Sequence, residues 1–241
     1  MPLTSTTSPA RRTGSISIRE AVVTWAAAWF IGNVLSSIVL SSSGAKKIAD
    51  AGPWWLAGAQ FVGWAPLVAG IVFVSYRSAT GSLVRDFGFT WRPIDLLGLP
   101  LGVATQLCFV RAVYFPLQHL WPHAFSMHKI EQPARDLWHH AHGAGLVMLV
   151  LVVAVGAPLV EELTYRGLLQ GAFTRSTKVV TAVVVVAAWF AAIHFQPVNI
   201  PGLFVVGLVL GVCAHRTGRL GMSVMAHMAF NATGLLLVAR S

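Results

Sequence analysis

Residues 145–167 read GLVMLVLVVAVGAPLVEELTYRG, an unbroken apolar run that ends in two adjacent carboxylates, Glu161 and Glu162. The chain of 241 residues has only 8 Asp and Glu, and these two are the only ones after position 137. A carboxylate at membrane depth costs several kcal/mol unless it is paired, protonated or facing a wet cavity. The sequence therefore predicts a functional site at this pair.

The composition identifies the bilayer as the solvent. Hydrophobic residues make up 56% of the chain and charged residues 10%, against about 25% in globular proteins, and the mean hydropathy is +0.69. A soluble core of this size cannot hide so much apolar surface. We therefore predict an all-α fold, a polytopic transmembrane bundle of seven or eight helices.

Seven apolar segments are candidates to cross the membrane. The sixth of these segments, at about 202–214, is short, and we expect it to be re-entrant or thinly packed. The predicted domains are a cytoplasmic N-terminal tail at 1–20 and a transmembrane domain at 21–241, with its core at about 145–239. The spans fall at about 21–42, 54–76, 95–115, 145–170, 179–196, 202–214 and 220–239.

The net charge of +9 is explained by the bias of Lys and Arg toward cytoplasmic segments, rather than by binding to nucleic acid. With the N-terminus inside, eleven of the 17 basic residues lie on inner segments. We therefore predict a multi-pass protein of the cell membrane with a cytoplasmic N-terminus, the lipid bilayer as partner and no nucleic acid.

Six of the 9 histidines lie between residues 116 and 142. His119 with His123, and His139 with His142, have helical spacings that could hold a metal ion. Because no Cys and no regularly placed carboxylate accompanies them, the pattern favours an amphipathic surface helix with a His-rich polar face.

Three of the predicted spans, the fourth, the fifth and the seventh, carry polar groups of catalytic type. Glu162 and Arg166 share one helical face and can pair, which leaves the neighbouring carboxylate free. His194 ends the fifth span, and His227 and Asn231 lie one turn apart in the seventh. A free carboxylate beside imidazoles suits a general base, and N–H donors suit a developing oxyanion. The residues therefore indicate a water-activating hydrolase inside the membrane.

Other hydrolase signatures are missing from the sequence. It has no His-Glu-x-x-His zinc motif, no Gly-x-Ser-x-Gly elbow and no pair of aspartates within the spans. Gln106 and Arg111, which are polar residues of the third span, are interpreted as packing or snorkelling groups.

Three motifs also match a known family in order. Residues Glu161 to Arg166 resemble the Glu-Glu-x-x-x-Arg motif of the CAAX-protease and bacteriocin-processing (CPBP, or Abi) intramembrane proteases. Phe190 to His194 match its Phe-x-x-x-His motif, and His227 to Asn231 its His-x-x-x-Asn motif. The resemblance covers about 145–239, and residues 88–95 also resemble a stretch of bacterial members.

The resemblance implies roles for these side chains. Glu161 with His194 would activate the attacking water, and His227 with Asn231 would stabilise the tetrahedral oxyanion. The residues that it implies as supporting the site are Glu162, Arg166 and Phe190.

The resemblance implies an intramembrane endopeptidase acting on membrane-associated peptides or proteins. We expect no required cofactor; the alternative is a divalent metal such as zinc at Glu161, His194 and His227. Two other functions stay open. One is a catalytically silent scaffold or immunity-type protein that binds a partner through the same pocket. The other is a proton-coupled carrier, for which an inverted repeat is expected but not visible.

Overall fold

The computed structural model describes residues 15–45 and 50–240, and all regular structure within these ranges is helical. The predicted helical fold is therefore confirmed. Most of the predicted N-terminal tail lies outside the described residues, as do Lys46 and Lys47, two of the basic residues counted above for the orientation. The α-helices are α1 Ile18–Ser42, α2 Pro53–Ser78, α3 Leu83–Phe87, α4 Gly98–Ala104, α5 Val110–Leu120, α6 Met127–His139, α7 Ala144–Leu151, α8 Ala157–Glu161, α9 Gly171–Thr174, α10 Val179–Ala192, α11 Ile200–Thr217 and α12 Gly221–Ala239. Tighter 3₁₀ turns form η2 Pro93–Leu97 and η6 Pro197–Asn199, and wider π-helical turns form η3 Thr105–Phe109, η4 Val152–Gly156 and η5 Glu162–Gln170.

Among the described residues, 6 helices are long and apolar enough to cross a membrane. Two of them combine several elements. The span Pro93–Leu120 consists of η2, α4, η3 and α5. The span Ala144–Thr174 consists of α7, η4, α8, η5 and α9. With the shorter apolar helix α10 there are seven apolar segments, as the hydropathy pattern predicts. The protein is thus a multi-pass membrane protein.

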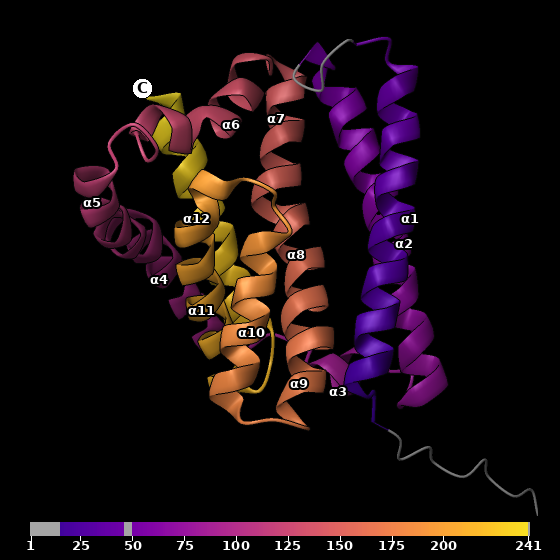
Figure 1. Cartoon of the computed structure of the whole chain (residues 1–241). Coiled ribbons are helices and arrows are strands. Elements are labelled where there is room, and N and C mark those ends of the chain that lie inside the picture. The colour runs from indigo at the N-terminus through magenta and orange to yellow at the C-terminus, as the bar shows by residue number, and fades with distance from the viewer. Residues whose placement is uncertain (1–14, 46–49, 241) are drawn as a thin grey trace, which may run out of the picture.

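The short segment is the fifth, not the sixth. The predicted fifth span, 179–196, ends as a helix at Ala192, whereas the sixth extends to 18 residues as α11. At 1.5 Å per residue, the 14 residues of α10 span about 21 Å, less than the roughly 30 Å hydrocarbon core. Figure 1 shows α10 starting beside α9 and stopping short of the far end of the bundle. The residue that follows α10 can therefore lie at membrane depth.

Small residues let the helix backbones approach closely, as is common in membranes. A Cβ on Gly102 of α4 would lie 2.1 Å from the Ala226 carbonyl oxygen of α12, and one on Gly207 of α11 would lie 2.9 Å from the Ala187 backbone of α10. These contacts draw α4, α10, α11 and α12 together around the span that carries the acidic pair.

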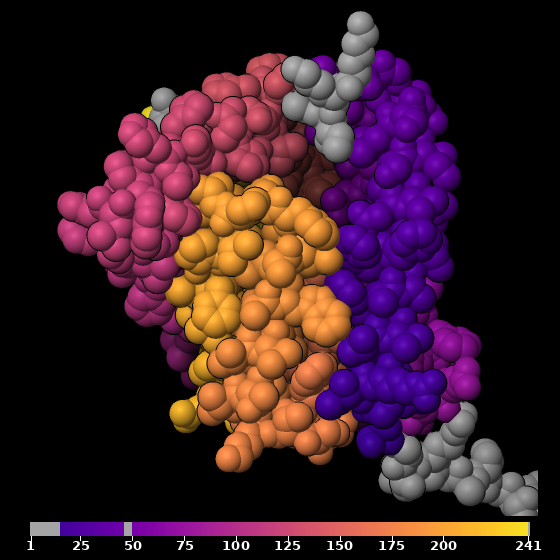
Figure 2. Space-filling model, viewed as in Figure 1, coloured from indigo at the N-terminus to yellow at the C-terminus, as the bar shows by residue number. Residues whose placement is uncertain are grey.

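Helices α1 and α2 form a hairpin on one flank of this bundle (Figure 1). Aromatic rings join it to the rest: Trp25 meets Trp189 edge-on with ring centroids 4.7 Å apart, and Trp29 lies 6.0 Å from Phe195. Figure 2 shows the seam along which the indigo N-terminal helices border the orange segment. The hairpin therefore packs against the helices that carry the site.

Helix α6 lies across one end of the bundle, beside the C-terminal end of α12 and next to α7 (Figure 1). Ser126 caps its first turn by accepting a hydrogen bond from the Lys129 N–H at 3.4 Å. The His-rich segment thus contains a short surface helix, and Ile130 and Ala134 of this helix face a cavity described below.

Candidate active site

The two adjacent glutamates have different environments. Glu161 ends α8 and Glu162 begins the π-helical segment η5. The Glu162 side chain is fully buried, whereas the Glu161 side chain is 25% exposed. Within the described residues the Glu161 carboxylate accepts no hydrogen bond, so it is the carboxylate left free for chemistry.

Glu162 is held by an arginine one turn further along. The Arg166 Nη1 donates to Glu162 Oε1 at 2.9 Å, and its Nη2 donates to the Gly207 carbonyl of α11 at 3.2 Å. The guanidinium carbon lies 4.7 Å from the centre of the Phe190 ring, a cation–π contact. The predicted pairing is therefore present, and it is braced against both α10 and α11.

His227 of α12 connects the two glutamates. Its Nδ1 lies 2.9 Å from Glu162 Oε1, and its Nε2 lies 3.8 Å from Glu161 Oε2. Because a carboxylate can only accept, Nδ1 carries the proton in the pair with Glu162. When Nε2 is protonated as well, that N–H is a donor beside the free carboxylate.

His194 lies in the turn that follows α10. Its Nδ1–H donates to the Phe190 carbonyl at 2.7 Å, which leaves Nε2 with its lone pair in the neutral ring. The Phe190 and His194 ring centroids are 4.8 Å apart. The next residue, Phe195, has a φ of 51°, an uncommon backbone conformation outside glycine, and the chain changes direction there. Local backbone geometry therefore fixes both the tautomer and the position of this imidazole.

Asn231 lies one turn beyond His227 on α12, and its Nδ2 donates to the Val153 carbonyl at 2.8 Å. Val153 belongs to the π-helical segment η4, and π turns occur often at functional sites. An amide nitrogen has two hydrogens, so one remains to bind another acceptor.

These side chains meet at one cavity of about 210 Å³, which we name the central cavity. It brings together all four residues predicted to be catalytic, with Phe190 in its wall. The predicted supporting residues Glu162 and Arg166 lie behind this wall, since they do not line it. The polar and aromatic lining is Gln60, Trp64, Glu161, Phe190, His194, His227, Phe230 and Asn231.

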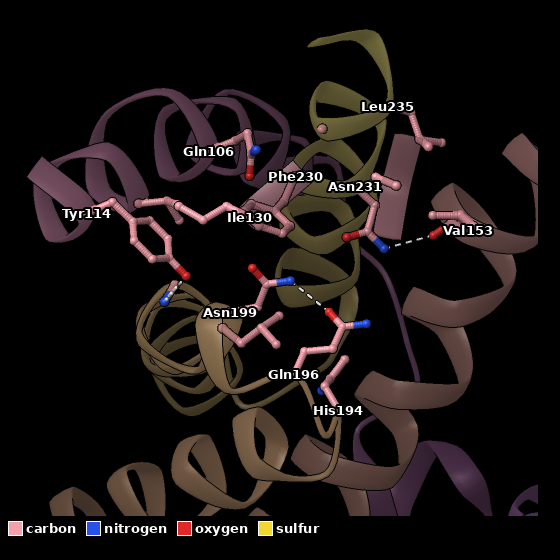
Figure 3. A pocket seen from close by; sticks show the side chains of 15 residues that line it. Gln106, Tyr114, Ile130, Val153, His194, Gln196, Asn199, Phe230, Asn231 and Leu235 are labelled. Carbon is pink, nitrogen blue, oxygen red and sulfur yellow. Dashed lines mark hydrogen bonds between the residues drawn. The ribbon is translucent and has the colours of Figure 1, made fainter. Parts of the chain in front are cut away.

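Two further cavities adjoin the central cavity, and His194 lines all three. The α1–α2 cavity, of about 360 Å³, shares Gln60, Trp64 and Glu161 with the central cavity. The α6-side cavity, of about 230 Å³, shares Asn231 with the central cavity (Figure 3).

Polar residues of the flanking cavities were not predicted to be functional from the sequence. Gln60 lines the central and α1–α2 cavities, and Asn33 lines the latter. Gln106, interpreted above as a packing group, lines the α6-side cavity with Asn199. The available signal was an isolated amide within an apolar segment, which is uncommon in transmembrane helices.

The described residues contain no group of three or more His, Cys, Asp or Glu that could hold a metal ion. His194 Nδ1 is engaged with a backbone carbonyl and His227 Nδ1 with Glu162, so only their Nε2 atoms are free for other ligands. The zinc alternative therefore needs side-chain movement to assemble a site, and independence from metal stays a prediction.

The fold and the site define a multi-pass helical membrane protein with a carboxylate–imidazole cluster open to an internal cavity. Residues 143–233 match the family model described as type II CAAX prenyl endopeptidase Rce1-like, so the family resemblance seen in the three motifs is confirmed for this part of the chain. The match supports a CAAX-type protease, that is, a hydrolase acting on protein substrates. No curated protein and no solved structure matched the chain.

Proposed function

We propose that this chain is an intramembrane endopeptidase that hydrolyses peptide bonds of membrane-associated peptides or proteins with a water activated by Glu161 and His194. One observation carries the proposal: four polar side chains from α8, α12 and the turn after α10 line a single cavity inside an otherwise apolar bundle. Ionisable groups at this depth are costly and mark functional sites.

In the proposed reaction, Glu161 accepts a proton from a water molecule bound beside His194 Nε2. The water oxygen attacks the carbonyl carbon of the peptide bond and forms a tetrahedral intermediate. The same proton is then delivered to the leaving nitrogen, the C–N bond breaks, and the products are a carboxylic acid and an amine. The atoms balance with water as the only co-reactant.

The negative charge that develops on the carbonyl oxygen needs donors. In our proposal these are the Nε2–H of His227 and the second amide hydrogen of Asn231, which come from the same face of α12. One such donor is worth about 10²–10³ in kcat. Glu162 and Arg166 act as positioning residues, because the Glu162 carboxylate orients the His227 ring.

The decisive experiment compares the purified protein with its Glu161→Gln variant on a defined library of unmodified peptides in detergent micelles. Products are identified by mass spectrometry. We expect the wild type to cleave and the variant to lose at least about 10²-fold in rate, as removal of a general base predicts. The partly exposed Glu161 tolerates an isosteric amide, so the variant should keep the wild-type melting temperature. Undiminished cleavage by a folded variant would reject the proposal, whereas absence of cleavage by the folded wild type would favour the catalytically silent scaffold.

A further inference from the structure

The candidate site has an adjoining cavity on each of two sides. The central cavity shares Val153, His194 and Asn231 with the α6-side cavity, and Gln60 and Glu161 with the α1–α2 cavity. A chain lying across the Glu161 and His194 side chains can therefore continue in both directions instead of ending at a closed wall.

The flanking cavities are polar but carry no fixed positive charge. Neither has a lysine or arginine among its described lining residues. A free terminal carboxylate needs a cation or several donors when it leaves water, and at membrane depth the cost of leaving it unpaired is several kcal/mol. The lining therefore disfavours a chain end beside the reacting bond.

Two amide oxygens in the α6-side cavity lack partners. Gln106 Oε1 and Asn199 Oδ1 are buried and make no hydrogen bond with any described residue. The Asn199 amide is oriented by its own Nδ2, which donates to Gln196 Oε1 at 2.7 Å. Figure 3 shows Gln106 entering the cavity from the top of the view and Asn199 from below. An unsatisfied buried acceptor costs about 1–3 kcal/mol, so both oxygens favour a ligand with N–H donors.

Two other polar residues of this cavity already make hydrogen bonds within the protein. The Tyr114 hydroxyl donates to the Val198 carbonyl at 2.8 Å and accepts from the Gly202 N–H at 3.3 Å. The Asn231 Nδ2 bonds Val153. The remaining surface, which includes Ile130 of α6 and Leu203, is apolar. The cavity therefore offers two unpaired acceptors, together with the second amide hydrogen of Asn231, within an apolar lining. This combination matches the N–H and C=O groups and the apolar side chains of a polypeptide.

We propose that the α6-side cavity is a substrate subsite for an uncharged stretch of continuing polypeptide, whose backbone N–H groups donate to Gln106 Oε1 and Asn199 Oδ1. The substrate class is thus a chain cleaved at an internal bond, with residues bound on both sides of it. This inference rests on the proposed function, since it concerns the same site.

The test uses matched peptide libraries that end either in a free carboxylate or in an amide. The wild type should cut both libraries at the same internal bonds. Removal of only a short carboxy-terminal fragment of constant length, with loss of cleavage in the amidated library, would overturn the inference.

The residue-level test is Gln106→Leu, which keeps the side-chain volume and removes the acceptor. The loss of one neutral hydrogen bond should raise KM about 3- to 10-fold with little change in kcat. The matched control is Gln118→Leu, because Gln118 is a half-buried amide in the same span that does not line the cavity. An unchanged KM in Gln106→Leu, or an equal rise in both variants, would contradict the subsite.

Binding to the Glu161→Gln variant provides a readout independent of turnover. There, Gln106→Leu should weaken binding of the amidated peptides by the same factor, and unchanged binding would overturn the inference. The two proposals can fail separately. Cleavage that survives Glu161→Gln rejects the proposed function, whereas cleavage that requires Glu161 but is indifferent to Gln106 rejects only the subsite.

Discussion

His227 Nδ1 lies 2.9 Å from Glu162 Oε1, although 65 positions separate the two residues in the chain. The same carboxylate oxygen accepts from Arg166 Nη1, so one buried atom joins α12 to η5. The neighbouring Glu161 stays free of such bonds among the described residues and faces the cavity. The pair of identical acids is thereby divided into one that holds the site together and one that is available to react.

This division predicts that Glu162 matters mainly for stability. Glu162→Gln leaves the Arg166 guanidinium fully buried without a counter-charge, and loss of one partner of a buried pair costs about 3–5 kcal/mol. We expect a clear fall in melting temperature in micelles, measured by tryptophan fluorescence.

The chain supplies a matched control in Glu131 and Arg135, another i,i+4 pair, whose side chains are 23% and 24% exposed. Glu131→Gln should cost no more than about 1 kcal/mol, because solvent screens this partly exposed pair and such pairs contribute little. Equal destabilisation by the two variants would show that burial of Glu162 is not what makes its pair important.

Asn231 is predicted to act on kcat. Asn231→Leu removes the amide donor next to His227, and loss of an oxyanion donor lowers kcat about 10²–10³-fold with KM nearly unchanged. Steady-state kinetics on a cleaved library peptide measures both constants. Thr233→Val is the control, since Thr233 Oγ1 donates only to the Ala229 carbonyl of its own helix, at 2.7 Å. A loss confined to KM would assign Asn231 to substrate binding instead.

Activity should survive removal of divalent metals. The predicted water activation uses only Glu161 and His194, and no preformed group of three metal ligands occurs among the described residues. Dialysis against EDTA and then 1,10-phenanthroline should leave the cleavage rate unchanged, with elemental analysis confirming removal. Loss of activity that added zinc restores would establish the metal alternative.

The stability of the α2–α3 junction should depend on pH through Asp86. Burial of this carboxyl opposes its ionisation, but hydrogen bonds from Ser75, Thr80 and the backbone of Ser82 outweigh burial and hold its pKa below the ordinary 3.8. A carboxylate whose pKa is lowered on folding stabilises the protein above its unfolded pKa, and this contribution is lost as the pH falls through the lower folded value.

Asp86→Asn should therefore lower the melting temperature at pH 7, and the difference from the wild type should shrink as the pH falls below about 3.8. Thermal unfolding of both proteins across this range is the measurement. A difference that stays constant down to the lowest pH would mean that the charge of Asp86 contributes nothing.

Much of the fold could be predicted because the bilayer imposes a simple rule. A helix needs roughly 20 apolar residues to cross the bilayer, so the runs around Gly145–Val160 and Gly221–Ala239 can be recognised as membrane spans. The rule failed at the fifth and sixth spans, where apolar residues continue past the end of α10. Hydropathy does not register that Ile193 to Gln196 turn instead of continuing the helix.

The polar side chains of the candidate site were also visible in the sequence, because ionisable groups in apolar runs are costly and stand out. Gln60 and Asn199 were not singled out, and Gln106 was interpreted as a packing or snorkelling group, since an isolated amide is as compatible with helix packing as with a binding site. Only the cavities that these amides line in the folded protein distinguish the two interpretations.

The sequence alone determined that this is a helical membrane protein with acid, imidazole and amide groups in three of its apolar regions. The physical reason is that the bilayer requires long apolar runs and makes polar groups within them costly, and both features are visible in composition and spacing. Tertiary structure decided that the predicted Glu162–Arg166 pair is fully buried and that its carboxylate also binds His227. These contacts depend on the Gly207 carbonyl, which accepts from Arg166, and on the His227 ring, which bonds Glu162. Such contacts between distant segments arise only when α11 and α12 pack against the fourth span.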